Sequence, residues 1–568
     1  MTQNERNPLT SEDYADLLIE YYGDFSVFDR FPNAVVNIIN ARLAIVHVPV
    51  SEITNSAVYD YGYSSMPSIF GLISRESLEA SGVLQIRNIP GFDLRGQGVL
   101  IGIIDSGIDY TNPIFQNEDG STRIALLWDQ TIESINPPAK LNYGTEYNRE
   151  QINYALQSNN PYSIVPSTDE VGHGTMVAGI AGGSEVPYNE FSGVATEAEF
   201  VVVKLKTAKR YLKEFFRIPE EAVCYQETDI LFGIEYLLAA ANRLQKPMAI
   251  CVALGTSQGA HDGRGFLSGY LSTISSIPGI AVIVAAGNEG NARRHFFGMV
   301  NTAVGYQTVE LNVGENERGF SMELWGQSPS IFFLDILSPS GEYVPSIYSS
   351  LDENREITFI FENTIIYIDF QMVETQSGDQ LILIRFTNPT PGIWRFNVYE
   401  RGNLDLGFHM WLPMEGFISN NTYFIQSDPY TTILSLGNAE VVLTVTAYND
   451  EDDSLYINAS RGNTRIGVPK PDIAAPGVNV LGPTLNQEFA NYTGTSVAAA
   501  HTTGIAAMLL EWGIVRGNLS GMSTVELKKL ILRGARRTAD IVYPNPDWGY
   551  GILDAYNVFN SLRIGIIL

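Results

Sequence analysis

Cysteine is scarce in this chain, which argues against a fold held together by disulfides. The 568 residues include only two cysteines, Cys224 and Cys251. Disulfide-rich secreted domains carry several cysteines in a short sequence, whereas Cys251 lies in an apolar run typical of a buried strand. We therefore expect no disulfide framework, and a chain of this length can bury a large apolar core without one.

Positive charge is also scarce. The sequence has 35 Lys and Arg against 63 Asp and Glu, which gives a formal net charge of −28. Contacts to nucleic-acid phosphates are made mainly by Lys and Arg, and anionic membrane surfaces attract the same residues. Nucleic acid and anionic membranes are therefore poor partners for this protein.

Two kinds of apolar segment are missing as well. No uninterrupted apolar stretch reaches the roughly 18 residues of a transmembrane helix, so we expect no membrane span. The N-terminal sequence Met-Thr-Gln-Asn-Glu-Arg-Asn-Pro lacks the basic start and apolar stretch of a secretory signal. We therefore expect a protein that is made without export through the Sec pathway.

Four polar residues stand where predicted strands end or predicted helices begin. Asp105 closes an apolar strand-like run and is followed by the turn sequence Ser-Gly. His173 lies between two glycines at the start of an apolar helix, and Ser496 follows Gly-Thr at the start of another. Asn288 follows a third apolar run, Ile-Ala-Val-Ile-Val-Ala-Ala-Gly.

These residue types together supply the chemistry of acyl transfer. A serine hydroxyl is a weak nucleophile, so Ser496 needs a base, and the ordinary pKa of a histidine such as His173 suits that role. Asp105 can hold the imidazole tautomer and stabilise the imidazolium as it forms. The Ser496 backbone N–H, at a helix N-terminus, and the Asn288 side chain can stabilise the negative charge that develops on the substrate carbonyl oxygen.

Each residue also has a common structural explanation, as a turn former, a structural histidine or a helix cap. However, the acid, the base and the nucleophile occur along the chain in the order Asp105, His173, Ser496. This order and the sequence around each residue resemble those of the subtilisin-like serine proteases, whose triad runs Asp, His, Ser. Residues 105–107 read Asp-Ser-Gly, residues 173–175 read His-Gly-Thr and residues 494–496 read Gly-Thr-Ser. The resemblance implies a serine endopeptidase that hydrolyses peptide bonds, with an α/β fold whose parallel sheet is flanked by helices.

The resemblance also implies a substrate-binding strand and one wall of the pocket for the P1 side chain (S1). These are formed by Leu254, Gly255, Thr256, Ala285, Ala286 and Gly287. Their small size predicts a pocket for large, apolar P1 residues. Glu289 matches a family position at the rim of S1, but a solvated loop carboxylate is an equal alternative. Calcium is possible in such enzymes, but its ligands cannot be identified from one sequence, and we name no metal residue.

The pattern of the chain predicts four parts. Residues 1–74 mix a helical stretch (11–22) with a strand-like run (43–50) and form an N-terminal module. Residues 75–292 alternate strands and helices, as in βαβ units on a parallel sheet. Residues 293–430 turn to short aromatic and β-branched runs, typical of an inserted antiparallel β-sandwich. The catalytic domain resumes over residues 431–568.

In subtilisin-like proteases the position of the N-terminal module is held by a propeptide that aids folding and inhibits the enzyme until it is cleaved. The resemblance therefore implies that residues 1–74 are a propeptide, and a permanently attached module is the alternative. Family catalytic domains begin shortly before the triad aspartate, which predicts autoprocessing between about residues 60 and 76.

A narrower resemblance concerns biological role. The acidic composition, the β-rich insertion and the sequence from Asp93 to Asp105 resemble the Csp germination proteases of clostridia. This implies a cytoplasmic or spore location, a jelly-roll insertion, and activation of a cortex-lytic zymogen by limited proteolysis during spore germination. General intracellular proteolysis is the alternative.

Two other classes are disfavoured. A catalytically silent regulator on a protease fold would be expected to lack a triad residue, and all three are present. An esterase of the α/β-hydrolase type would place its residues in the order Ser, acid, His.

Overall fold

A nine-stranded sheet forms the centre of the predicted catalytic domain. The computed structural model describes residues 7–32, 34–73, 93–134, 137–301, 303–347, 352–402, 404 and 406–564. The strands run in the order β25-β24-β12-β10-β5-β8-β6-β7, with β26 also paired to β24. Their bounds are Ser454–Leu455, Leu443–Asn449, Ile280–Ala285, Met248–Val252, Leu100–Asp105, Glu199–Lys204, Ile124–Asp129, Thr145–Asn148 and, for β26, Ile473–Pro476.

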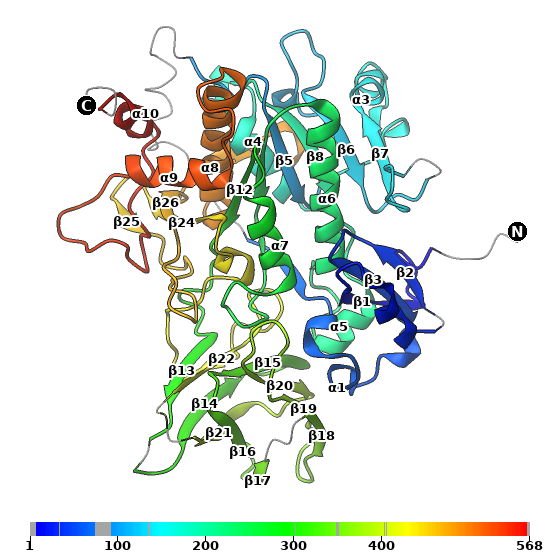
Figure 1. Ribbon diagram of the computed structural model, residues 1–568, viewed down its shortest axis with the longest axis vertical. Coiled ribbons are helices and arrows are strands. Elements are labelled where there is room, and N and C mark those ends of the chain that lie inside the picture. The colour runs from blue at the N-terminus through cyan, green and yellow to red at the C-terminus, as the bar shows by residue number, and fades with distance from the viewer. Residues whose placement is uncertain are drawn as a thin grey trace, which may run out of the picture.

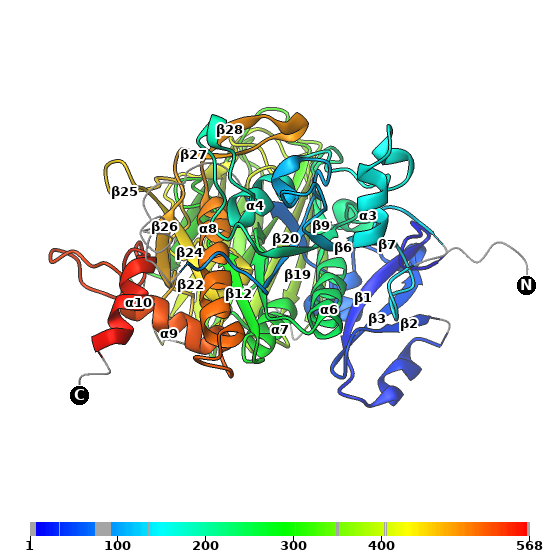
Figure 2. The same ribbon diagram turned by 90° about the horizontal axis from the view of Figure 1, so that it is seen from above.

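Helices cover both faces of this sheet (Figures 1 and 2). Parallel strands buried on both faces are apolar throughout, and alternate residues of β5 belong to two different hydrophobic clusters. Ile101 and Ile103 pack with α4 and α8, whereas Leu100 and Ile104 pack with α6 and α7. The helices are α3 (Arg149–Leu156), α4 (His173–Gly182), α5 (Arg210–Phe216), α6 (Glu227–Leu244), α7 (Phe266–Ile274), α8 (Thr495–Leu510), α9 (Thr524–Gly534) and α10 (Ala555–Ile564).

The long apolar helix α8, with the π-helical turn that continues it, belongs to this core. Within the described residues, the segment Thr495–Val515 is the one helix that is long and apolar enough to cross a membrane. However, 89% of its most apolar window is buried inside the protein. Its composition is therefore explained by its position between the sheet and its neighbours.

The insertion consists of two antiparallel sheets, which lie below the catalytic domain in Figure 1. Their facing side chains share one hydrophobic cluster, as in a β-sandwich. One sheet contains β13 (His295–Met299), β22 (Gly407–Trp411), β15 (Gly319–Gly326), β20 (Gln380–Thr387), β19 (Ile365–Gln371) and β18 (Asp352–Thr358). The other contains β17 (Tyr343–Ile347), β16 (Ile331–Leu337), β21 (Gly392–Arg401), β14 (Gln307–Val313) and β23 (Tyr423–Phe424).

The N-terminal module is built on a small antiparallel sheet of β1 (Tyr14–Glu20), β3 (Leu43–Pro49) and β2 (Val35–Ile38). The strand predicted over 43–50 is confirmed by β3, but the helix predicted over 11–22 is wrong, because β1 occupies that segment. All seven residues of β1 pair with β3, and five consecutive side chains, 15–19, are buried. Strand pairing and burial on both faces thus override the helical tendency of the local sequence.

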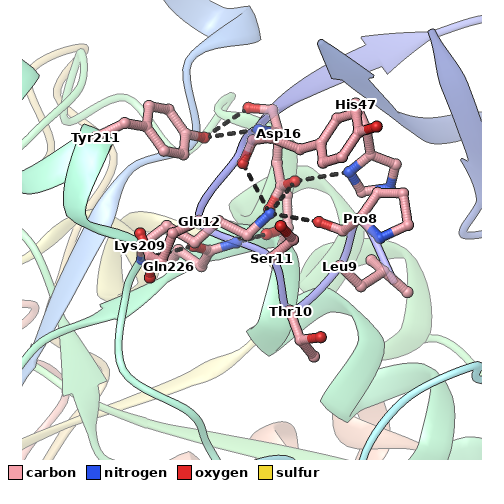
Figure 3. A network of polar contacts seen from close by, with 12 residues as sticks. Pro8, Leu9, Thr10, Ser11, Glu12, Asp16, His47, Lys209, Tyr211 and Gln226 are labelled. Atoms are coloured by element: carbon pink, nitrogen blue, oxygen red, sulfur yellow. Dashed lines mark hydrogen bonds and ion pairs between the residues drawn. The ribbon is translucent and has the colours of Figure 1, made fainter. Parts of the chain in front are cut away.

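A buried group of charges holds β1 against the catalytic domain (Figure 3). The Lys209 ammonium, at the start of α5, donates to Asp16 Oδ1 at 2.7 Å and to the Pro8 carbonyl at 2.7 Å. The His47 ring lies 2.7 Å from the same oxygen of Asp16, and the Gln226 amide donates to the other oxygen at 2.7 Å. Burial raises the pKa of Asp16, but the charge of Lys209 and the contact with His47 lower that pKa by more, so it lies well below its ordinary value.

We predict that Lys209→Met loosens the module. Removing one partner of a buried ion pair leaves the other charge buried and unpaired, which costs about 3–5 kcal/mol of unfolding free energy. The neighbouring Arg210→Met is the matched control, because Arg210 is 72% exposed in its ion pair with Glu214, and such pairs contribute at most about 1 kcal/mol. Chemical denaturation measures both variants, and equal unfolding free energies would contradict the prediction.

Candidate functional site

The site begins with a contact between the end of β5 and the start of α4. The His173 Nδ1 atom lies 2.8 and 2.9 Å from the two carboxylate oxygens of Asp105, and both side chains are buried. Burial lowers the pKa of His173, but the charge and hydrogen bond of Asp105 raise it by more, so this pKa lies above the ordinary 6.5. The structure therefore joins two of the four residues predicted from the sequence.

The glycines around these residues permit the close approach of strand and helix. A Cβ atom on Gly174 would lie 2.1 Å from the Gly107 carbonyl oxygen and 3.1 Å from the Asp105 Cβ. Gly172, which precedes α4, has a φ of 84°, a left-handed conformation that glycine adopts at no steric cost. The pattern of glycines next to Asp105 and His173 thus has a steric explanation.

Asp169 fastens this junction and was missed in the sequence analysis. One carboxylate oxygen accepts from the Gly172 N–H and from the Ser106 hydroxyl, both at 2.8 Å. The other accepts from the N–H and hydroxyl of Thr175, at 2.9 and 2.7 Å. A carboxylate at a helix N-terminus satisfies unpaired N–H groups, so an aspartate four residues before His173 is a signal that could have identified it.

Asn288 lies at the start of α8, the helix whose second residue is Ser496. The Asn288 Oδ1 atom accepts from the N–H and from the hydroxyl of Thr495, both at 3.2 Å. These bonds fix the rotation of the Asn288 amide and hence the direction in which its NH₂ group donates. The Ser496 hydroxyl is completely buried and has no hydrogen-bond partner among the described residues. Helices α4 and α8, which carry His173 and Ser496, pack against each other.

A segment of the N-terminal module occupies the groove beside these residues. Strand β4 (Ile69–Leu72) lies between β9 (Tyr225–Gln226) and β11 (Leu254–Gly255), antiparallel to both. Beyond β4, the Ile73 N–H donates to the Ala253 carbonyl at 3.3 Å. The Ile73 carbonyl oxygen lies 3.1 Å from His173 Nε2. The chain thus enters the groove as a third strand and reaches the histidine.

Two of the six residues predicted to bind substrate pair with this segment, and the other four contact other parts of the chain. Leu254 and Gly255 pair with β4. Ala285 ends β12, and the next residue, Ala286, accepts from the Leu434 N–H at 2.9 Å. Thr256 and Gly287 form hydrogen bonds with other parts of the chain. The Thr256 carbonyl accepts from the Ser435 N–H at 2.9 Å, and the Gly287 N–H donates to the Thr495 hydroxyl at 2.9 Å.

Leu434 takes up space beside two of the residues predicted to line the S1 pocket. A Cβ atom on Gly255 would lie 2.3 Å from Leu434 Cδ1, and one on Gly287 would lie 2.6 Å from Leu434 Cγ. Both glycines therefore make room for Leu434, which is 1% exposed. The Ile73 Cδ1 atom lies 3.0 Å from the same hypothetical Cβ on Gly255. The space at this site is thus shared between Leu434 and a medium-sized side chain.

Of the two interpretations of Glu289 from the sequence, the rim of S1 and a solvated loop carboxylate, the second is wrong. It is 4% exposed, and its carboxylate forms an ion pair with Arg294 at 2.7 Å. Its backbone N–H donates to the Ser460 hydroxyl at 2.9 Å. Glu289 is therefore a buried structural residue directly after Asn288.

No metal centre accompanies the site in the part of the chain that the structure describes. Across those residues, no three side chains of the His, Cys, Asp or Glu type are grouped so that they could hold a metal ion. The two cysteines are both buried free thiols.

Comparisons with known proteins give a consistent result. The sequence profile of the subtilase family matches residues 96–313 and 420–552, more than half of the chain. The solved structure of the Clostridium perfringens CspB protease is similar, with a TM-score of 0.76 and 30% sequence identity, over 85% of this chain and 96% of that chain. Two subtilisin-like proteases of Arabidopsis thaliana, SBT3.6 and SBT3.3, are 23% and 24% identical over 73% of this chain. The chain spans only 56% of the length of each Arabidopsis protein.

Proposed function

The chain belongs to the subtilase family, as the motifs around Asp105, His173 and Ser496 predicted, and we propose that it is a serine endopeptidase that uses these three residues to cleave proteins. The observation that carries the proposal is the position of residues 69–73. This segment lies in the groove as an added strand, and its last described carbonyl faces His173 at 3.1 Å. Antiparallel strand addition is a common way to bind an extended peptide.

In the proposed reaction the Ser496 hydroxyl attacks the substrate carbonyl carbon. His173 Nε2 takes the hydroxyl proton and later delivers it to the leaving amine. Asp105 keeps the proton of the ring on Nδ1 and stabilises the imidazolium through the contact at 2.8 Å. Water then hydrolyses the acyl-enzyme by the same steps.

The negative charge of each tetrahedral intermediate needs donors that are already in place. The Ser496 N–H, in the first turn of α8, is one such donor, because the first N–H groups of a helix have no intrahelical partner. The Asn288 amide is the other, and its rotation is set by Thr495. We assign these two groups to the oxyanion hole.

The segment in the groove defines the subsites and the processing site. Ile73, whose carbonyl faces His173, occupies the P1 position. Leu72, Gly71 and Phe70 then occupy P2, P3 and P4 in turn. The scissile bond joins Ile73 to Ser74, within the range of residues 60–76 that the sequence indicated; Ser74 lies outside the described residues. The module of residues 1–73 is then a propeptide that the enzyme removes by its own nucleophile.

The same contacts explain how the module would inhibit the enzyme. An ionised carboxylate and a carbonyl are both acceptors, so His173, between Asp105 and the Ile73 carbonyl, satisfies both only by donating from both ring nitrogens. The contact with Ile73 also raises the pKa of His173. A protonated imidazole cannot accept the Ser496 proton, so self-cleavage requires the Ile73 carbonyl to leave Nε2 first. A module that returns to this position keeps the base inactive.

For biological role, we propose that the enzyme activates a spore cortex-lytic zymogen by limited proteolysis during germination, in the cytoplasm or spore. The support is the similarity to the Clostridium perfringens CspB protease over 96% of that chain. The two-sheet insertion is proposed to be the jelly roll expected of such enzymes. General intracellular proteolysis is the second candidate, since the Arabidopsis relatives support only a subtilisin-like protease.

Autoprocessing tests the proposed chemistry. Intact mass spectrometry of the purified wild-type chain should show two fragments, one ending at Ile73 and one starting at Ser74, because the Ile73 carbonyl lies beside His173, the proposed general base. Ser496→Ala should remain at full length. Ser276→Ala, which changes an exposed serine outside the site, should be processed like the wild type. Identical processing of wild type and Ser496→Ala would exclude Ser496 as the nucleophile.

Leu434 generates a prediction about P1. Leu434→Ala should enlarge the pocket and raise kcat/KM for a peptide with Phe at P1, relative to one with Ile, on the order of tenfold or more, since a few methylene groups are worth about 1–3 kcal/mol in such pockets. Leu436→Ala is the matched control, because Leu436 is also 1% exposed but packs in the other hydrophobic cluster. Peptide kinetics decide the point: an unchanged Phe-to-Ile ratio in Leu434→Ala would show that Leu434 does not limit the pocket.

A further inference from the structure

A turn from the end of the insertion covers the groove at Gly71. The turn comprises residues 414–417, three residues beyond β22, and we call it the roof turn. A Cβ atom on Gly71 would lie 3.2 Å from Met414 Cε and 3.2 Å from Phe417 Cζ. Met414 and Phe417 are 3% and 4% exposed. The groove is therefore closed over the residue that we assign to P3.

We propose that the roof turn makes the third subsite selective for glycine. This proposal rests on the proposed function, because residue 71 is P3 only if the chain is cut after Ile73. A separation of 3.2 Å is already shorter than ordinary carbon–carbon contact at about 3.5–4.0 Å. Larger side chains reach further from the backbone than Cβ and would have to displace both apolar side chains. A branched residue such as Val at P3 therefore cannot enter the groove unless the roof turn moves.

Backbone conformation does not account for glycine at this position. Gly71 lies inside β4 and has no positive φ, so its backbone is one that any residue adopts. Glycine within a strand also weakens that strand. The requirement for glycine thus comes from the space above the strand.

The backbone of the roof turn is fastened to the site, so a larger side chain at residue 71 has to displace the Met414 and Phe417 side chains. Its Glu415 N–H donates to the Glu289 carboxylate at 3.0 Å, and the Phe417 N–H donates to the Met414 carbonyl at 3.1 Å. Glu289 is held in turn by Arg294 at 2.7 Å. A methionine side chain alone is flexible, but here the backbone that carries it is tied to the residue after Asn288.

The roof turn and Leu434 are parts of one hydrophobic cluster around the segment in the groove. Met414, Phe417, Leu434 and Ile73 all belong to the same hydrophobic cluster. Together they restrict P3 to glycine and P1 to a medium-sized aliphatic residue, as in the chain's own sequence Phe-Gly-Leu-Ile. Such a requirement is met at few sites in a typical protein, so it favours limited proteolysis over general protein turnover.

Peptide kinetics on the processed enzyme test the roof turn. Two internally quenched peptides, containing Phe-Gly-Leu-Ile-Ser-Arg or Phe-Val-Leu-Ile-Ser-Arg, are compared by kcat/KM. Any module that remains bound lowers both values equally, so the ratio is preserved. The wild type should prefer the glycine peptide at least tenfold. Met414→Ala, alone or with Phe417→Ala, should reduce the preference to below threefold.

Met410→Ala is the control of matched chemistry, because Met410 is fully buried in the core of the insertion and not in the roof turn. It should keep the wild-type preference. Equal cleavage of the two peptides by the wild type, or a preference that survives removal of both roof side chains, would overturn the proposal.

A second measurement does not depend on activity. In the full-length Ser496→Ala chain, Gly71→Val should lower the thermal midpoint, and it should lower it clearly less when Met414→Ala is also present. Additive effects of the two substitutions would overturn the proposal. If the wild-type chain stays uncut and neither peptide is cleaved, the proposed function has failed. The thermal midpoints of the single and double variants still decide whether a side chain at residue 71 clashes with Met414.

Discussion

The site depends on one contact, the pairing of His173 with Asp105 between the start of α4 and the end of β5. A helix and a strand can bring these side chains to 2.8 Å only if their backbones nearly touch. The absence of a side chain at Gly174 permits this approach, because a Cβ there would meet the Gly107 carbonyl at 2.1 Å. Asp169 then joins the two elements through Ser106 and Thr175. The Asp105–His173 geometry is therefore a property of the whole junction.

Three parts of the chain converge on this junction. The catalytic domain supplies the sheet edge at which β5 and β12 end, since parallel strands bring their carboxyl ends to one side. The N-terminal module supplies the strand in the groove and is fixed by the buried charges around Asp16 (Figure 3). The insertion supplies the roof turn, which Glu289 ties to the residue after Asn288. The proposed catalysis, inhibition and substrate choice are thus linked through neighbouring residues.

The sequence predicted those features that local pattern determines. Apolar runs with polar ends identified β5 and β12, and small residues before a helix marked His173 and Ser496. The helix predicted near the N-terminus is instead β1, because its partner strand and Lys209 lie far away in the sequence. Leu434 was missed for the same reason: small residues at 255 and 287 indicate free space, but only the fold shows which side chain fills it. The role of Glu289 likewise depends on Glu415, which lies 126 residues further along the chain and which no local pattern connects to it.

The central claim is that Ser496 is a nucleophile activated by His173, in a groove that the N-terminal module covers. Labelling with a fluorophosphonate, followed by peptide mapping, tests this claim most directly, because the reagent needs an activated serine. We predict a single label on Ser496 in the processed enzyme, faster labelling once the module has been displaced, and no label in His173→Ala. A label on another residue, or equal labelling of Ser496 in the wild type and in His173→Ala, would contradict the account.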